Sequence, residues 1–120
     1  RKGFQWDRFV SNVRELRRVC PHARVRFGVT VSVLNILRLP TLLRALEAEC
    51  DAHPSDFALH PVQDPIFYRS QVLPAPLKKS AKQGIEAYIE AIRSNDPEIP
   101  SEGGVVGDLR AQIDYMCLED

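Results

Sequence analysis

The sequence predicts an α/β protein in which helices cover a sheet of parallel strands. Residues 24–34 alternate valine or phenylalanine with polar or small residues, and residues 57–62 form a second short apolar run bounded by prolines. Residues 41–50 between them have helical apolar spacing. A strand–helix–strand order requires a crossover connection and therefore parallel strands. Because two strands alone make no stable sheet, we expect part of a repeated β/α array such as a barrel.

Three other segments have the three- and four-residue apolar spacing of amphipathic helices: 6–19, 76–93 and 105–118. Their predicted inward positions are Phe9, Val10, Val13 and Leu16 in the first, Leu77, Ala81, Ile85, Tyr88, Ile89 and Ile92 in the second, and Val106, Leu109, Ile113 and Met116 or Cys117 in the third. Residues 95–104 hold three acids, two prolines and two glycines, a composition that predicts a linker.

Composition indicates one globular domain of a water-soluble class. The 120 residues are 44% hydrophobic and 27% charged, unlike a disordered chain, and no run is apolar enough for a membrane span. The chain starts without a methionine or a signal peptide, so we expect it to begin within a longer, cytoplasmic protein. The cysteines Cys20, Cys50 and Cys117 lie far apart, which predicts buried thiols in a reducing compartment and no metal site.

The charges are unevenly spread although the formal net charge is zero. Residues 1–50 hold ten Lys/Arg and four Asp/Glu (+6), and residues 51–120 hold six and twelve (−6). A basic half is a feature of some nucleic-acid-binding proteins. Solvent-facing sides of amphipathic helices explain these arginines better. The arginines concerned are Arg14, Arg17, Arg18 and Arg44.

Polar residues stand where the two predicted strands end, which is where β/α proteins bind ligands. Thr30 and Ser32 share one face of the first strand, and Asn35 follows at its exit. These side chains suit a polar ligand. Alternatively, Thr30 and Ser32 have their hydrogen bonds satisfied within the strand, and Asn35 is a turn residue that caps the next helix. His60 and Gln63 stand at the end of the second strand. A lone histidine there is a ligand candidate or a structural hydrogen-bonding group.

Other motifs carry weaker signals. His22 and His53 stand beside prolines in predicted loops, and no Ser/His/Asp order or paired-carboxylate site is persuasive. Gly103-Gly104 precedes a helix but follows no strand, so it makes a poor phosphate loop. Tyr68, Arg69 and the lysines of 78–82 form a weak nucleic-acid signal that a solvated loop and helix explain better.

Four segments, in order, resemble radical S-adenosylmethionine (SAM) enzymes of the SPASM/twitch group. Residues 1–16 resemble the segment after the fourth barrel strand: an Arg1-Lys2-Gly3 turn, an aromatic residue at Phe4 or Trp6, and Asn12-Val13 within a helix. Residues 29–46 resemble the fifth strand and its helix, with a TVS-x-x-N pattern followed by an LP-type helix start. Residues 60–81 are similar to the sixth strand and the LP-x-x-x-K segment after it, and residues 112–120 to the helix that leaves the barrel.

The resemblance implies the C-terminal part of a partial (β/α)6 TIM-like barrel over residues 1–94, a linker at 95–104 and an exit helix at 105–120. It implies SAM and a [4Fe-4S] cluster as cofactors, and reductive cleavage of SAM to a 5′-deoxyadenosyl radical that abstracts a substrate hydrogen. The cluster's CxxxCxxC motif is absent from this sequence, so its ligands would lie upstream of Arg1. The isolated chain should therefore be inactive.

By the same resemblance, Arg1 corresponds to an arginine that contacts the SAM carboxylate, and Thr30, Ser32 and Asn35 to residues lining the SAM cavity. His60 and Gln63 correspond to positions near the adenine or the substrate. The implied partners are a peptide or small-molecule substrate and a reductant such as flavodoxin or ferredoxin, without a membrane and without nucleic acid. The alternatives are a non-catalytic β/α binding domain and, less favoured, a nucleic-acid-binding module.

Overall fold

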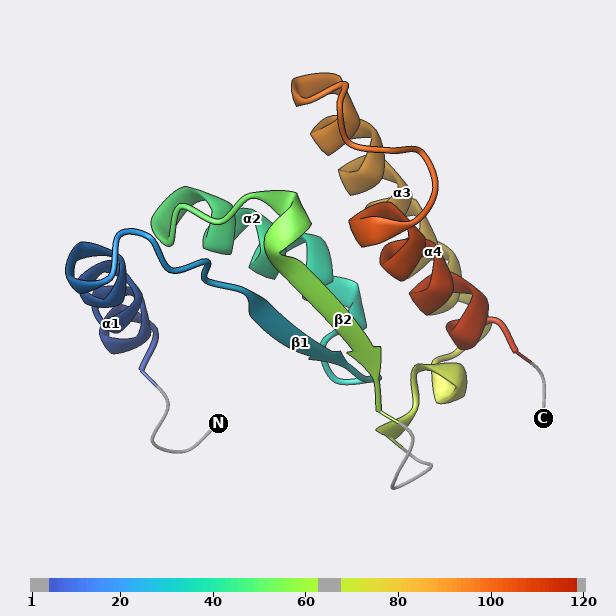
Figure 1. Ribbon diagram of the computed structural model, residues 1–120. Helices are drawn as coiled ribbons and strands as arrows, with labels where there is room; N and C mark the ends of the chain where they lie inside the picture. Colours follow the sequence, from blue (N-terminus) through green and yellow to red (C-terminus); the bar gives the residue numbers. More distant parts are fainter. Residues whose placement is uncertain (1–4, 63–67, 119–120) are drawn as a thin grey trace.

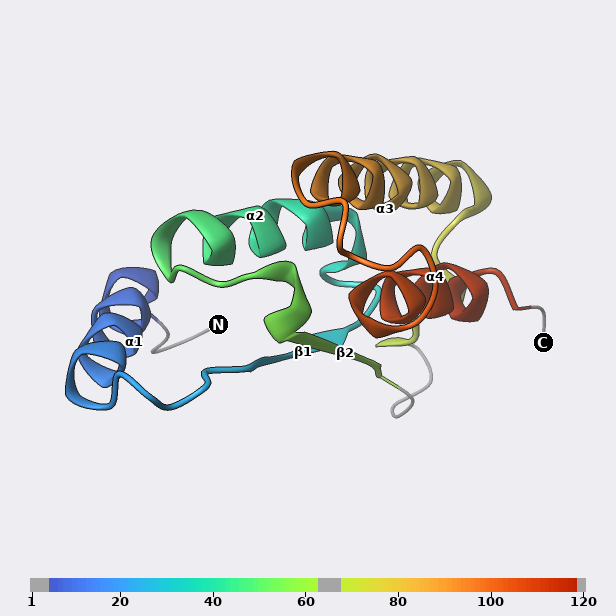
Figure 2. The same cartoon turned by 45° about the horizontal axis from the view of Figure 1, so that its top comes forward.

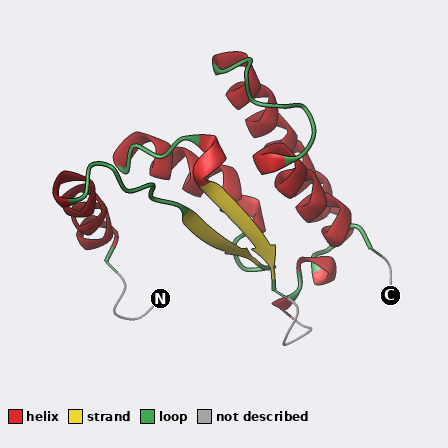
Figure 3. Cartoon of the chain, viewed as in Figure 1, coloured by secondary structure: helices red, strands yellow, loops and turns green. Residues whose placement is uncertain are grey.

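The computed structural model describes residues 5–62 and 68–118 (Figure 1). Helices and strands alternate as far as the second strand, and only helices follow it, as Figure 3 shows by colour. The main elements are α1 (Trp6–Val19), β1 (Phe27–Val31), α2 (Leu39–Glu49), β2 (Phe57–Pro61), α3 (Ala75–Asn95) and α4 (Gly104–Met116). Short 3-10 turns are η1 (Ile36–Arg38), η2 (Pro54–Asp56) and η4 (Ser70–Val72). The protein is therefore of the α/β class, as the sequence predicts.

The two strands lie side by side and run in the same direction, which confirms the parallel pairing. Phe27 is in register with Phe57, and the register continues to Val31 and Pro61. Figure 2 shows the sheet nearly edge-on, with α2, α3 and α4 all on one side. That side carries the buried residues Phe27, Val29, Val31, Phe57 and Leu59. Among the described residues, no helix packs on the other side of the two-stranded sheet.

The first strand is shorter than the predicted 24–34 at both ends, and its early end on the carboxyl side has a local cause. Regular alternation ends at Val31, where the chain turns into η1. The Ser32 hydroxyl accepts the Leu34 N–H at 3.1 Å, and the Asn35 side chain takes the backbone groups that a longer strand would use. Serine and asparagine compete with strand hydrogen bonding in this way. The apolar alternation alone does not reveal that competition.

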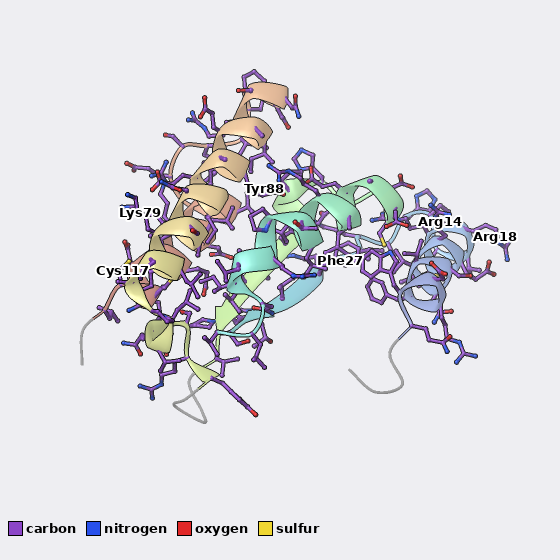
Figure 4. All side chains as sticks on the ribbon, turned by 180° about the vertical axis from the view of Figure 1, so that it is seen from behind. Arg14, Arg18, Phe27, Lys79, Tyr88 and Cys117 are labelled. Atoms are coloured by element: carbon purple, nitrogen blue, oxygen red, sulfur yellow. The ribbon has the colours of Figure 1, made fainter. Side chains whose placement is uncertain are left out.

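Helix α1 is attached to the end of α2 by arginine side chains. Arg14 Nε donates to the Glu49 carbonyl at 3.1 Å, and Arg17 Nε donates to the Cys50 carbonyl at 3.0 Å. These carbonyls belong to the end of α2, where a helix has unpaired oxygens and partial negative charge. Arg14, Arg18 and Arg44 are exposed, in keeping with the predicted solvent-facing arginines, whereas Arg17 is half-buried (Figure 4).

Helices α2 and α3 meet around a buried tyrosine. Tyr88 is almost fully buried, and its hydroxyl donates to Glu47 Oε2 at 2.6 Å. Burial and the hydrogen bond to the Glu47 carboxylate raise the pKa of the Tyr88 hydroxyl far above its usual value. The Arg44 guanidinium lies 5.5 Å from the centre of the same ring. The hydroxyl thus has a partner at this depth, as a buried tyrosine needs.

Helix α4 packs back onto β2 and α3. The predicted inward residues Val106, Leu109, Ile113 and Met116 are all buried, whereas Cys117 is exposed. Before α4, Gly103 and Gly104 have φ angles of 74° and 54°, a backbone region in which other residues are strained. The predicted linker is accordingly a turn of positive-φ glycines that brings α4 against the sheet.

The predicted burial of four side chains is wrong. Cys20 and Cys117 are exposed, and only Cys50 has the buried thiol expected of all three. Leu16 and Leu77 were assigned to apolar stripes but are 47% and 41% exposed, since each lies near a helix end beyond the packed stretch. Within the described residues, the helices are too short or too polar to cross a bilayer.

A leucine pair tests the core. Leu43 on α2 is fully buried, whereas Leu34 is 75% exposed. We expect Leu43→Ala to lower the free energy of unfolding by about 2–5 kcal/mol, because it removes buried methyl groups and leaves a cavity. Leu34→Ala, the matched control, should change it by less than about 0.5 kcal/mol. Urea denaturation followed by circular dichroism measures both, and equal effects would contradict this core.

Candidate functional site

The carboxyl ends of β1 and β2 bring two of the predicted site residues together. Thr30 and His60 are register partners in neighbouring strands, and both are exposed. Side chains alternate along a strand, so they lie on the opposite face from the buried Val29 and Leu59. That is the helix-free face of the sheet. A hydroxyl and an imidazole therefore stand side by side at the end of the sheet where β/α proteins bind ligands.

Ser32 does not share this face with Thr30 as the strand prediction implied. It follows the last residue of β1, is 9% exposed, and accepts the Leu34 N–H with its hydroxyl. Among the described residues its hydroxyl acts as an acceptor within the turn, so the side chain belongs to the turn. Ser32 therefore shapes the end of β1 rather than extending the exposed polar face.

Asn35 closes the end of the outer edge of β1. Its Nδ2 donates to the Thr30 carbonyl at 2.7 Å, and its Oδ1 accepts the Ser32 N–H at 2.8 Å. The side-chain amide thus takes the place of a neighbouring strand's peptide group. The alternative prediction for Asn35 was a turn residue that caps the next helix. Asn35 is a turn residue, but its side chain bonds to the end of β1 and makes no capping hydrogen bond to η1. It keeps Thr30 in position.

The other predicted site residues are only partly described. No hydrogen-bond partner of the His60 ring occurs among residues 5–62 and 68–118. Arg1 and Gln63 lie outside the described residues. In the same described ranges, no group of three histidine, cysteine, aspartate or glutamate side chains could hold a metal ion.

The two outer edges of the sheet differ. On β2, the Leu59 N–H donates to Asp108 Oδ2 of α4 at 3.3 Å, and Pro61 has no N–H to offer. Helix α4 therefore covers that edge. On β1, Val31 bonds toward β2 through its carbonyl, so the backbone groups of Gly28 point outward.

A hollow of about 440 Å³ lies along the open edge of β1. Its walls include Trp6 and Phe9 from α1 and Leu42 and Leu46 from α2. Apolar walls beside outward-facing peptide groups have the shape and chemistry that another strand would fit. In the part of the chain that the structure describes, the sheet is thus covered at the β2 edge and without a further strand at the β1 edge.

Sequence reasoning missed the contact that covers the β2 edge. Asp108 and Leu59 are 49 positions apart, so no local spacing signals their contact. It also set aside His53, which contacts Ser55 and Asp96 at the opposite end of the sheet. The local signal present was a proline at the start of η2 with Asp56 two positions later, where its side chain accepts the His53 N–H.

Comparison with known proteins identifies no relative: no family model, no curated protein and no solved structure matches this chain.

Asn35 provides a test of the site's scaffold. Asn35→Ala removes both edge hydrogen bonds, so we expect about 1–2 kcal/mol less stability and faster hydrogen exchange at the Ser32 amide. Asn12→Ala, on the exposed face of α1, is the matched control and should change neither quantity appreciably. Urea denaturation and amide exchange measured by NMR give the two readouts. An unchanged Ser32 exchange rate would refute the role of Asn35.

Proposed function

We propose that this chain is the C-terminal part of a cytoplasmic radical SAM enzyme barrel, and that the carboxyl end of its sheet contributes to the cavity for SAM and substrate. The observation that carries the proposal is the Thr30–His60 pair. It lies on the helix-free face of two parallel strands, at their carboxyl ends. The lumen of a β/α barrel is bounded by that face, and its ligands bind at that end.

The candidate site residues have two proposed roles, ligand contact and support of the strand end. Thr30 offers an exposed hydroxyl and His60 an exposed imidazole, so these two are the proposed contacts to the polar parts of SAM and to the substrate. Ser32 and Asn35 bond mainly to backbone, so they act by holding the strand end in place. The resemblance adds Arg1 for the SAM carboxylate and Gln63 beside His60.

The two sheet edges support a barrel that is open on one side. β2 would be its last strand, because α4 covers its outer edge through Asp108. β1 would continue the barrel, because among the described residues no strand pairs with its outer edge, which borders a largely apolar hollow. The strand filling that hollow would precede α1 in the chain, as β1 precedes α2.

The iron–sulfur cluster does not fit the described residues of this chain. They contain no group of three metal-ligating side chains, and Cys20, Cys50 and Cys117 have no cluster spacing. When bound in such enzymes, the cluster supplies the electron that cleaves SAM. This chain would serve a different purpose: binding, orienting and shielding the reactants.

The whole protein encoded by the gene provides the decisive test. We expect a CxxxCxxC motif before Arg1 and, after anaerobic iron–sulfur reconstitution, formation of 5′-deoxyadenosine from SAM in the presence of a reductant. A gene without the motif, and a protein that forms neither cluster nor product, would refute the enzyme. The non-catalytic binding domain would then be the better account.

A threonine pair tests the cavity itself. In the whole protein, Thr30→Val keeps the side-chain shape but removes the hydroxyl, so we expect the dissociation constant for SAM to rise roughly tenfold, the effect of one lost hydrogen bond. Thr41→Val, an exposed threonine on α2, is the matched control. Isothermal titration calorimetry measures both. Equal affinity of wild type and Thr30→Val would remove Thr30 from the site.

A further inference from the structure

A second polar cluster lies at the opposite, amino end of the sheet. His53 precedes the turn η2, Ser55 lies within it, and Asp96 follows α3. His53 Nδ1 is 2.7 Å from Ser55 Oγ, and His53 Nε2 is 2.9 Å from Asp96 Oδ2. The three side chains thus form a continuous hydrogen-bonded chain of hydroxyl, imidazole and carboxylate.

The backbone determines which imidazole nitrogen carries the proton. The Ser55 N–H, which can only donate, points at His53 Nδ1 over 3.1 Å. Nδ1 must therefore be the unprotonated acceptor, and Nε2–H donates to Asp96. The Ser55 hydroxyl, 2.7 Å from Nδ1, is then a second donor that shares the Nδ1 lone pair with the Ser55 N–H. This is the proton arrangement in which an imidazole can accept a serine proton while a carboxylate orients it, although the two ring nitrogens are exchanged relative to the chymotrypsin arrangement.

Asp96 is held in its ionised form. The hydrogen bond from His53 is the main cause of a lowered pKa of the Asp96 carboxyl, and the Glu98 backbone N–H, 3.1 Å from Asp96 Oδ1, adds to it. A negative Asp96 can stabilise the imidazolium that forms when His53 accepts a proton. Asp96 consequently has the negative charge required of the residue that orients the base.

A cavity of about 570 Å³ adjoins the cluster, and its lining includes His53, Ser55 and Asp96. The first residues of α4, Gly104 and Val105, line the same cavity. Figures 1 and 2 show the start of α4 beside the turn that leads into β2, and residues of the two elements are in contact. The first N–H groups of a helix have no partner within it, so they can donate to an oxygen that gains negative charge.

We propose that Ser55, His53 and Asp96 form an acyl-transfer site that cleaves small carboxylic esters. Ser55 Oγ attacks the ester carbonyl carbon while its proton passes to His53 Nδ1. The C–O bond to the alcohol then breaks, and the alcohol leaves with the proton from Nδ1. Water repeats the sequence on acyl-Ser55, releasing the carboxylic acid and restoring the serine hydroxyl.

The geometry also sets a limit on the rate. While Nδ1 carries the proton it cannot accept the Ser55 N–H, so each transfer costs that hydrogen bond. The cluster is also partly exposed: the His53 and Asp96 side chains are 49% and 35% accessible. Water therefore competes for the donors and weakens electrostatic stabilisation. We expect slow turnover, with accumulation of acyl-Ser55 when the alcohol is a good leaving group.

The experiment uses the full chain with p-nitrophenyl acetate, monitoring p-nitrophenol release and locating the acetyl group by peptide mass spectrometry. We expect a stoichiometric burst and acetylation at Ser55. Ser55→Ala should abolish the burst, and Asp96→Asn should slow it about 100-fold, the usual contribution of an oriented base. Circular dichroism of each variant verifies that it is folded.

Two matched controls separate the site from ordinary surface reactivity. Ser94→Ala removes an exposed serine from α3, and His22→Ala removes an exposed histidine from a loop. Both should retain the full burst. Acetylation confined to lysines, or an unchanged burst in folded Ser55→Ala, would overturn the proposal and leave the cluster as a capped turn. Neither outcome bears on the SAM site, which lies at the other end of the sheet.

Discussion

Parallel hydrogen bonding between β1 and β2 is the constraint on which the rest of this structure depends. Parallel strands cannot be joined by a tight turn, so the chain must cross over, and α2 provides that crossover. The crossover places a helix on one face of the sheet, and α3 and α4 add to the same layer (Figure 2). The opposite face is left to Thr30 and His60. The candidate ligand face thus follows from strand direction.

Each end of the sheet then acquires its own polar chemistry. At the carboxyl end, Asn35 satisfies the backbone of β1 and leaves the Thr30 hydroxyl exposed. At the amino end, the turn before β2 brings His53 to Ser55 and, across 43 residues, to Asp96. The two outer edges of the sheet also differ, since Asp108 of α4 covers the β2 edge whereas no described strand pairs with the β1 edge. A sheet closed on one side is suited to adding strands on the other.

Local patterns predicted the elements well, and their ends less well. The helix at 6–19 was predicted with its observed bounds. Valines at three-residue spacing mark one face, arginines occupy the opposite face, and a proline follows the helix. The predicted extension of β1 through residue 34 was wrong, because the side chains of Ser32 and Asn35 form hydrogen bonds with the backbone there. The alternation of apolar and polar residues does not reveal those hydrogen bonds. The positions of Thr30 and His60 near the carboxyl ends of the two parallel strands were predictable from the sequence. The Asp108–Leu59 and His53–Asp96 contacts were not, because tertiary packing alone brings these segments together.

Engineered disulfides test the parallel pairing most directly, in a background with the three natural cysteines replaced. Residues 30 and 60 are register partners in this structure, whereas residues 30 and 58 would be partners if the strands ran antiparallel between the same ends. Disulfides require Cα atoms within about 7 Å. We predict that Thr30→Cys with His60→Cys forms the bond readily on mild oxidation, and that Thr30→Cys with Ala58→Cys does not. Cross-linking of the second pair without the first would contradict the parallel sheet and the ligand face built on it.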